Sequence, residues 1–539
     1  MRKLLTFVAS LLITGSLFAG GLVTNNNQSA MFTRLQNRNA STSIDAVYFN
    51  PAGLTRLGTG FFASVNNQTI TQTQKVNSDY PYLLPTPKKY VGNVSAPIFP
   101  GIYLVYNTGK LSFSAGFNPI GGGGGAKYKT GLPSFEMNIA DIPPSLTAQG
   151  IPTTKYSSDI YFKGSSVYFG YQANVGYKIN DNFSVAVGAR LVTATNKYSG
   201  YLKNIMINPT YPAFGAGFTG GMVLASNFFT AGAATLNGLA ALATSAASGL
   251  TAAITGGVPA GTPLSAMPPA TAAGVTQILG AAGISTAGMN IGTAAATLNA
   301  VSPGFTAKAN TMTANAGATQ DINVNATESG TGITPILSAN FSPAENLDIA
   351  VKYEFKTELN LKTKVSNNEG GGVFVDGQTV IADMPAMLSF GVDYRPVKRL
   401  LLSASFDEYF DKQVDYDGSA TININEIDKN FVEYGLGVEY GLTEKLRISA
   451  GWAHTETGVN LNYQSDQSFS TNTDSFGGGF GYRITPMIDI NLAGQYTFYN
   501  DGKKAYDPRL SFDPNPYTET YKKVTWMVAL GLDFYFGKK

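Results

Sequence analysis

The residues that support most enzyme chemistry are scarce in this chain of 539 residues. Cysteine is absent and the only histidine is His454, so zinc sites and nucleophile–histidine triads lack the side chains that they need. The glycine run 121–125 is not followed by the lysine and hydroxyl residue of a phosphate-binding loop. Asp407, Glu408 and Asp411 could hold calcium, although acidic residues in loops are usually only solvated. We therefore expect neither an enzyme nor a bound metal or cofactor.

Four residues are candidates for contact with a ligand that has an apolar body and a carboxylate. Arg190 and Lys197 are cations on one predicted strand, and either could meet the carboxylate. Because side chains alternate across a strand, Arg190 should face the interior of a closed sheet and Lys197 its outside, unless a bulge intervenes. Tyr48 and Phe49 supply aromatic surface near the N-terminus.

The N-terminal residues and the composition indicate where the chain resides. Met1, Arg2 and Lys3 precede an apolar run at Leu4–Phe18, and small residues follow at 19–21. This predicts a signal peptide over residues 1–20, because the run is too short for a comfortable transmembrane helix. Charged residues make up 13% of the chain, about half the usual share in soluble domains, and Phe and Tyr are abundant. The net charge of +2 argues against a nucleic-acid partner.

Alternation with a period of two is the main secondary-structure signal. From Val167 to Ile179 every second residue is apolar, and the residues between are mostly small or polar. One apolar face and one polar face are typical of a transmembrane antiparallel β-barrel, which we expect over residues 59–539. The pattern predicts about fourteen strands, near residues 59–74, 98–107, 110–118, 161–179, 182–199, 320–341, 346–363, 385–395, 399–411, 430–440, 445–457, 473–484, 487–499 and 520–536.

The links between the predicted strands alternate between short and long. Short turns toward the periplasm and long loops toward the outside are expected of barrels in the outer membrane of Gram-negative bacteria. An even number of strands lets the barrel close, so that no unpaired sheet edge meets lipid.

Residues 21–58 precede the first strand and do not alternate. Such a segment cannot lie in lipid without regular backbone hydrogen bonds. It could hang in the periplasm, but a barrel of fourteen strands is wide enough to leak unless it is filled. We therefore expect residues 21–58 to form a plug, or hatch, in the lumen.

Four segments together resemble the FadL/TodX family of outer-membrane transporters of hydrophobic compounds. They are Asp45–Leu54, which contains Asn-Pro-Ala, and Asp383–Pro396, Tyr434–Tyr440 and Leu446–Trp452. The resemblance implies a hatch centred on Asn50, Pro51, Ala52, Gly53 and Leu54. It also implies movement of long-chain fatty acids or aromatic hydrocarbons, with an inward kink in the third strand that opens a lateral exit into the membrane.

A candidate for that kink is present in the third predicted strand. Phe117 runs into Asn118, Pro119 and then glycines that include Gly121 and Gly122. Proline cannot donate to the ladder, and glycine tolerates bulges, so pairing should break here. The alternative is that Pro119 begins an ordinary outer loop.

The long link near 200–319 departs from the family pattern. Residues 204–307 contain no charged residue and are rich in Ala, Gly and Thr. Leu236, Leu239, Leu242 and Ala246 fall at helical spacing, so we expect short apolar helices in this outer loop. They could form an apolar landing surface for substrate, pack in the barrel mouth, or be a lineage-specific insertion without a role in transport.

The function that we predict is passive uptake of hydrophobic compounds, above all long-chain fatty acids. Apolar loops would capture the ligand, the hatch would hold it, and the wall gap would release it. A surface adhesin or contact protein, an aromatic-hydrocarbon channel and a general porin are the alternatives. A porin should have many lumen charges, whereas inward positions here look mostly like Gly, Ser, Asn and Ala. We expect a monomer whose partners are outer-membrane lipid, a hydrophobic small molecule and the barrel-assembly machinery.

Overall fold

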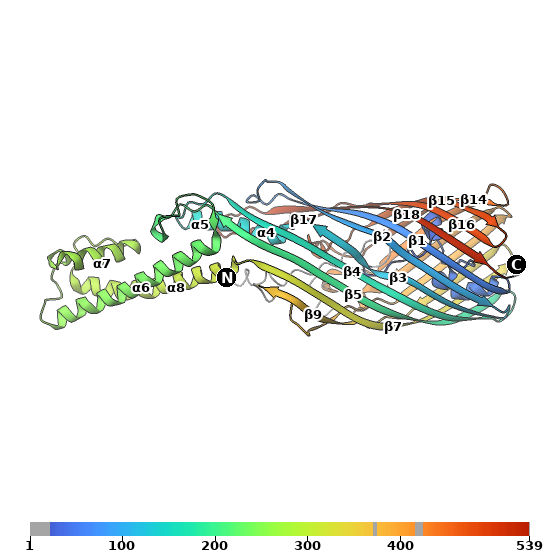
Figure 1. Ribbon diagram of the computed structural model, residues 1–539, viewed down its shortest axis with the longest axis horizontal. Helices are drawn as coiled ribbons and strands as arrows, with labels where there is room; N and C mark the ends of the chain where they lie inside the picture. The colour runs from blue at the N-terminus through green and yellow to red at the C-terminus, as the bar shows by residue number, and fades with distance from the viewer. Residues whose placement is uncertain (1–21, 370–373, 415–423, 538–539) are drawn as a thin grey trace.

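Fourteen long antiparallel strands close into a barrel in the computed structural model of the chain (Figure 1), which describes residues 22–369, 374–414 and 424–537. The barrel is closed because the first long strand pairs with both the second and the last. The fourteen strands are β1 (Gly60–Ser78), β2 (Lys88–Asn107), β3 (Leu111–Tyr128), β4 (Tyr156–Lys178), β5 (Phe183–Ile207), β7 (Ile322–Ala344), β8 (Leu347–Glu354), β11 (Met387–Val397), β12 (Leu400–Tyr409), β13 (Phe431–Gly441), β14 (Leu446–Glu456), β15 (Thr473–Thr485), β16 (Ile488–Tyr499) and β18 (Tyr517–Tyr535). The predicted fold class and strand number are confirmed.

The side chains of β4 show why this sequence forms a membrane wall. Tyr171, Val175 and Tyr177 are exposed on the outside, whereas Gln172 and Asn174 between them are buried in the interior. This arrangement inverts that of a soluble protein, because lipid takes the place of the core.

One predicted strand, 346–363, is interrupted. It consists of β8 and a separate strand, β9 (Asn360–Glu369), and both pair with β7. Between them the chain passes close to Gly330 and Gly332 of β7, where an added Cβ would lie 2.4 Å from the carbonyl oxygens of Asn360 and Glu358. The glycines therefore make room for the interruption. The remaining short strands are β6 (Val223–Leu224), β10 (Thr379–Ile381) and β17 (Gly502–Tyr506).

The N-terminal segment lies inside the barrel, and its side chains from residue 22 to 55 are almost all buried. It contains α2 (Ala30–Leu35), α3 (Ala46–Phe49) and the 3-10 helix η2 (Pro51–Arg56). The backbone N–H and C=O groups that these short helices and turns leave unpaired can find hydrogen-bond partners because polar side chains of the wall surround the segment. The predicted plug is thus present, and the predicted signal peptide lies outside the described residues.

Helices gather at the end of the barrel that has the long loops, which we call the outer end (Figure 1). Helices α4 (Pro133–Ala140) and α5 (Ile142–Ala148) cover the mouth, while α6 (Ala225–Thr255), α7 (Pro269–Ala281) and α8 (Ile291–Ala318) project away from it. The expectation of short helices was wrong, since α6 has 31 residues and α8 has 28. Buried alanines at 240, 243 and 247 allow close packing along α6, and this packing stabilises the length. The remaining 3-10 turns are η3 (Pro212–Phe214), η4 (Leu264–Ala266), η5 (Asp411–Gln413), η6 (Ile424–Glu426) and η7 (Leu461–Tyr463).

Candidate functional site

The Asn-Pro-Ala segment of the plug is hydrogen-bonded to the barrel wall. The buried Asn50 amide donates to Asn340 Oδ1 on β7 at 2.8 Å. The backbone N–H of Ala52 donates to Ser338 Oγ on β7 at 2.9 Å, and its carbonyl accepts from Ser184 Oγ on β5 at 2.8 Å. Pro51 is the first residue of η2, a position whose N–H makes no hydrogen bond within the helix, so proline costs nothing there. The segment therefore fixes the plug to two neighbouring strands.

Gly53 and Leu54 complete this contact. A Cβ on Gly53 would lie 2.4 Å from Asn50 Nδ2 and 2.5 Å from the carbonyl oxygen of Ser41, so only glycine fits. The Leu54 side chain is buried with other plug residues, and its carbonyl accepts from Asn107 Nδ2 of β2 at 3.1 Å. The five predicted hatch residues thus form one packed unit against β2, β5 and β7.

Arg190 points into the barrel, as strand parity predicted, but it is already paired. Its guanidinium donates to both carboxylate oxygens of Glu354 on β8, at 2.6 and 2.9 Å, and to Gln172 Oε1 at 2.6 Å. Lys352 donates to the same carboxylate at 2.7 Å and to the carbonyl of Tyr48 at 3.1 Å. Two cations thus share one carboxylate.

Aromatic plug residues cover the charged cluster. The Tyr48 ring lies 4.9 Å from the Arg190 guanidinium carbon and 4.6 Å from Lys352 Nζ, and a ring face attracts cations at such distances. Phe49 stacks on Phe32 at a centroid distance of 5.6 Å. Tyr48, Phe49 and the cations therefore form one cluster between plug and wall, whereas Lys197 is exposed on the outside and lies apart from it.

Sequence reasoning missed Lys352 and Glu354, and it underestimated the charges of the lumen. Both lie on inward positions of a predicted strand, so alternation could have found them. Further inward acids bond to the plug: Asp407 accepts from Asn39, and Glu433 accepts from Asn26. Many inward wall positions do carry Gly, Ser, Asn or Ala, as expected, but these charged residues stand among them and pair with polar plug residues.

Strand β3 separates from β2 at the predicted kink. Val94 still pairs with Ala126, and Ile102 pairs with Phe117, but no pairing joins the residues between. On its other side β3 stays bonded to β4, with register shifts beside Gly121. The segment 118–125 is part of the strand and not an ordinary loop, so the wall lacks ladder hydrogen bonds between β2 and β3.

Two prolines on β2 help to explain this gap, although the strand pattern alone did not single them out. Pro97 and Pro100 lie within the unpaired stretch of β2 and have no N–H to donate toward β3. Their strand remains paired with β1 through a bulge. A search for proline on both partners of a predicted pair would have located the gap more firmly than Pro119 alone.

The N-terminus of the plug takes the place of β2 along the kink. The Asn25 N–H donates to the Ile120 carbonyl at 2.8 Å, and the Gly122 N–H donates to the Val23 carbonyl at 3.0 Å. Asn118 also donates to Gln28 Oε1 at 2.7 Å. Gly121 must be glycine, since a Cβ there would lie 2.6 Å from the Val23 carbonyl oxygen. The plug and the kinked strand are therefore coupled through backbone hydrogen bonds.

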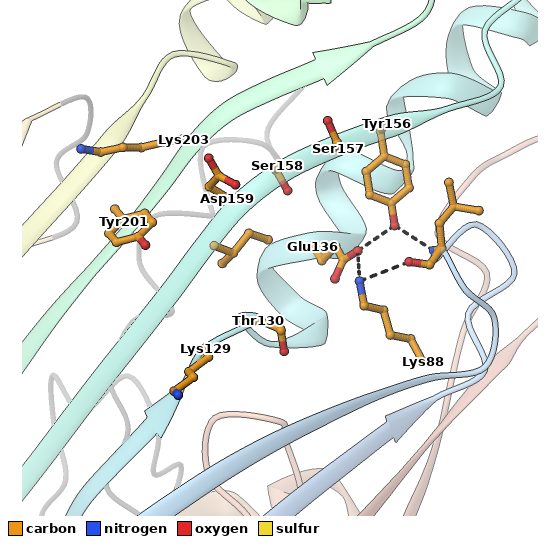
Figure 2. A pocket seen from close by; sticks show the side chains of 12 residues that line it. Lys88, Lys129, Thr130, Glu136, Tyr156, Ser157, Ser158, Asp159, Tyr201 and Lys203 are labelled. Atoms are coloured by element: carbon orange, nitrogen blue, oxygen red, sulfur yellow. Dashed lines mark hydrogen bonds and ion pairs between the residues drawn. The ribbon is translucent and has the colours of Figure 1, made fainter. Parts of the chain in front are cut away.

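A pocket of about 650 Å³ opens at the outer end between β4, β5 and α4 (Figure 2). Leu84, Ile160 and Tyr201 supply apolar surface, and Lys129 and Lys203 bring positive charge. Glu136 accepts from Lys88 at 2.5 Å and from Tyr156 at 2.8 Å, so its carboxylate is occupied. Helix α4 was not predicted from the sequence, although Pro133 stands at its start, where proline is favoured.

A second polar network holds the loop beside this pocket. Tyr80 donates to Asp141, which also accepts from Arg509 at 2.9 Å. Burial, and then the hydrogen bond to Asp141, raises the pKa of Tyr80 well above its ordinary value. Tyr80 therefore remains a protonated donor, and the network ties the loop after β1 to α4 and to the loop before β18.

The chain is similar to one family model and to several solved structures. A family model described as outer membrane protein transport protein (OMPP1/FadL/TodX) matches residues 279–536. The solved structure of a Pseudomonas aeruginosa FadL homologue is similar with a TM-score of 0.55 and 12% identity, over 98% of this chain and 100% of that chain. The Pseudomonas putida toluene transporter TodX gives a TM-score of 0.49 at 12% identity, over 92% of this chain and 95% of that chain. The Ralstonia pickettii toluene transporter TbuX gives 0.46 at 15% identity, over 92% and 94%. No curated protein sequence gives a significant match.

Proposed function

We propose that the chain is an outer-membrane channel that takes up long-chain fatty acids by passive diffusion, since residues 279–536 match the family model described as outer membrane protein transport protein (OMPP1/FadL/TodX). In this proposal the ligand is captured at the outer mouth, moves between plug and wall, and leaves through the gap between β2 and β3. The observation that carries it is the bonding of the plug's N-terminus to the kinked segment of β3.

Capture would use the pocket at the outer end. Its apolar residues Leu84, Ile160 and Tyr201 suit an alkyl chain, since each buried CH₂ contributes roughly 0.8 kcal/mol. Lys129 and Lys203 take part in no ion pair that the described part of the chain shows, so they can meet a carboxylate. An aromatic hydrocarbon would use the apolar surface but gain nothing from these cations.

Passage would displace the contacts between plug and wall. The cluster of Arg190, Lys352 and Glu354 pairs two cations with one carboxylate, and the buried Asp407 also acts electrostatically on Lys352. Its cations are held by Glu354 and Tyr48, so a carboxylate would have to compete for them. We therefore assign this cluster to transient contact beside Tyr48 and Phe49, and not to tight binding.

Release would follow from movement of the plug's N-terminus. Val23 and Asn25 occupy backbone groups of β3 that β2 leaves unpaired. If these bonds break when a ligand displaces the plug, the gap between β2 and β3 connects the lumen with the membrane. Diffusion down the gradient then needs no energy source.

Uptake of a labelled long-chain fatty acid tests the proposal in cells that lack their own outer-membrane fatty-acid channel. We expect uptake with the natural chain and its loss when Asn50, Pro51 and Ala52 are all replaced by glycine. A control with glycine at Thr42 and Ser43, which are partly exposed plug residues without a side-chain bond to the wall among the described contacts, should keep uptake.

The outcomes test the identity of the substrate and the role of the Asn-Pro-Ala contact separately. No uptake with any form, at equal surface expression, would refute fatty acid as the substrate, and labelled toluene would then be offered to the same cells. Uptake that survives the triple change would refute the Asn-Pro-Ala contact as the gate.

A further inference from the structure

Positive charge gathers on one side of the outer wall of the barrel. Lys127 on β3, Lys163 on β4, Lys197 on β5, and Lys362 and Lys364 on β9 are exposed, and buried inward-facing residues lie between them. We call these five residues the lysine patch. Their side chains point away from the lumen, and none of the five lines the outer pocket.

The strand register brings the lysine patch together. Lys127 lies directly opposite Lys163, and Lys163 lies opposite Ser199, two residues from Lys197. Lys197 and Lys364 both lie opposite Thr327 of β7, one on each side. Strands are about 4.8 Å apart, so the backbones of Lys197 and Lys364 are separated by roughly 10 Å.

These charges have no acidic partner in the described part of the chain. The lysines that form ion pairs there are others, namely Lys88, Lys178, Lys352, Lys356 and Lys522. Like charges directly opposite each other destabilise a strand pair, so Lys127 and Lys163 are unfavourable neighbours by themselves. An anion between them would offset this cost.

The lysine patch lies at the border of the apolar band. On β4, outward positions from Val167 to Tyr177 are apolar, and this stretch matches the 9–11 residues of one membrane crossing. Lys163 follows two outward positions beyond Val167, toward the outer end. Tyr161 and Tyr201, whose rings stack at 5.5 Å, flank it as aromatic residues do at a membrane interface. The ammonium groups are thus at the level of the outer-leaflet headgroups.

The other side of the barrel lacks this charge. At the outer ends of β12, β14 and β15 the outward positions carry Glu408, Glu456 and Asp474, which are acids. Ordinary solubility would be served by mixed charges all round. The one-sided concentration of lysine therefore indicates a partner with negative charge.

We propose that the lysine patch binds the phosphate groups of lipopolysaccharide, the phosphorylated glycolipid of the outer leaflet. Clustered lysines near a membrane surface attract anionic headgroups, and the ammonium group is a compact charge that suits phosphate. Bound glycolipid would neutralise the opposed Lys127 and Lys163 and orient the barrel in its membrane.

Binding of purified lipid A with both phosphates, by the full mature chain in neutral detergent micelles, tests this inference. The variant K163Q/K197Q/K364Q removes three exposed charges from the patch. The matched control K110Q/K398Q/K445Q removes three exposed charges from the short turns at the opposite end. Retention of the heat-dependent gel mobility of a closed barrel verifies that each variant is folded.

We expect the patch variant to bind lipid A on the order of a hundred-fold more weakly, and the control to bind like the natural chain. Binding should also weaken with added salt, because exposed charges are screened. The inference is overturned if the patch variant binds normally, if both variants lose affinity equally, or if lipid A without phosphates binds as well. Fatty-acid uptake is a separate readout, so failure of this inference leaves the proposed function standing.

Discussion

Glu354 joins the two wall cations that lie against the plug residue Tyr48. Its carboxylate is buried and pairs with both Arg190 and Lys352. Without it, two buried cations would lose the carboxylate to which both donate hydrogen bonds. Buried ion pairs contribute little net stability when complete, but they are costly when one partner is removed.

We predict that Glu354→Gln lowers the free energy of unfolding by about 3–5 kcal/mol, as expected when a buried charge loses its partner. Urea unfolding of the refolded barrel measures this loss. Glu358→Gln is the matched control on the same segment, because the Glu358 side chain is 78% exposed and lies 4.0 Å from Lys356. Its effect should be at most about 1 kcal/mol. Equal effects of the two changes would contradict the assigned role of Glu354.

The kinked strand β3 sets the geometry of the gap. Its glycines differ in whether a larger residue could replace them. Gly122 has a φ of +88°, and a Cβ there would lie 2.6 Å from the Ser166 carbonyl oxygen. A Cβ on Gly125 would make only an ordinary contact at 3.4 Å with Ser165 Cβ.

We predict that Gly122→Ala destabilises the kink by at least about 1–2 kcal/mol, the cost of placing alanine in the left-handed region. Gly125→Ala should leave it intact. Hydrogen exchange of the Asn25 and Gly122 amides measures the effect, since each donates across the bridge between plug and β3. Faster exchange in both variants, or in neither, would be inconsistent with this account of the kink.

The projecting helices are a separate element with a separate expectation. Exposed residues of α6 are mostly small or polar, such as Asn237, Ser245 and Ser248, and Leu242 is its one exposed large apolar side chain among the described residues. Such a surface offers an alkyl chain little to bind. Phe228 and Phe229 at the base of α6, by contrast, pack into the cluster at the barrel mouth.

We predict that replacing residues 237–306 by a short Gly-Ser linker leaves fatty-acid uptake unchanged. The excised range contributes no residue to the outer pocket, and the base of α6 remains in place. Uptake assays at matched surface expression measure this. Loss of uptake would instead support the helices as the first landing surface for substrate.

Most of the whole molecule could be predicted from the sequence, because a membrane wall enforces strict alternation. The fourteen strands and the plug follow from that pattern and from the length of the segment before it. The long α6 and α8 were underestimated, since their stability comes from packing on each other and not from local propensity. Lys352 and Glu354 were missed because their importance depends on contacts between β8 and the plug, which are distant in sequence.

The central claim concerns the whole molecule: ligand leaves through the wall between β2 and β3. The chain has no cysteine, so a single cysteine can be modified without side reactions. Ile98 lies in the unpaired stretch of β2 with 75% of its surface exposed, and Ile333 lies on the outer wall of β7 with 63% exposed. The decisive measurement is fatty-acid uptake by Ile98→Cys and Ile333→Cys before and after reaction with a bulky maleimide. The account predicts that modification abolishes uptake at residue 98 and spares it at residue 333. Unimpaired uptake after complete modification at residue 98 would contradict lateral release.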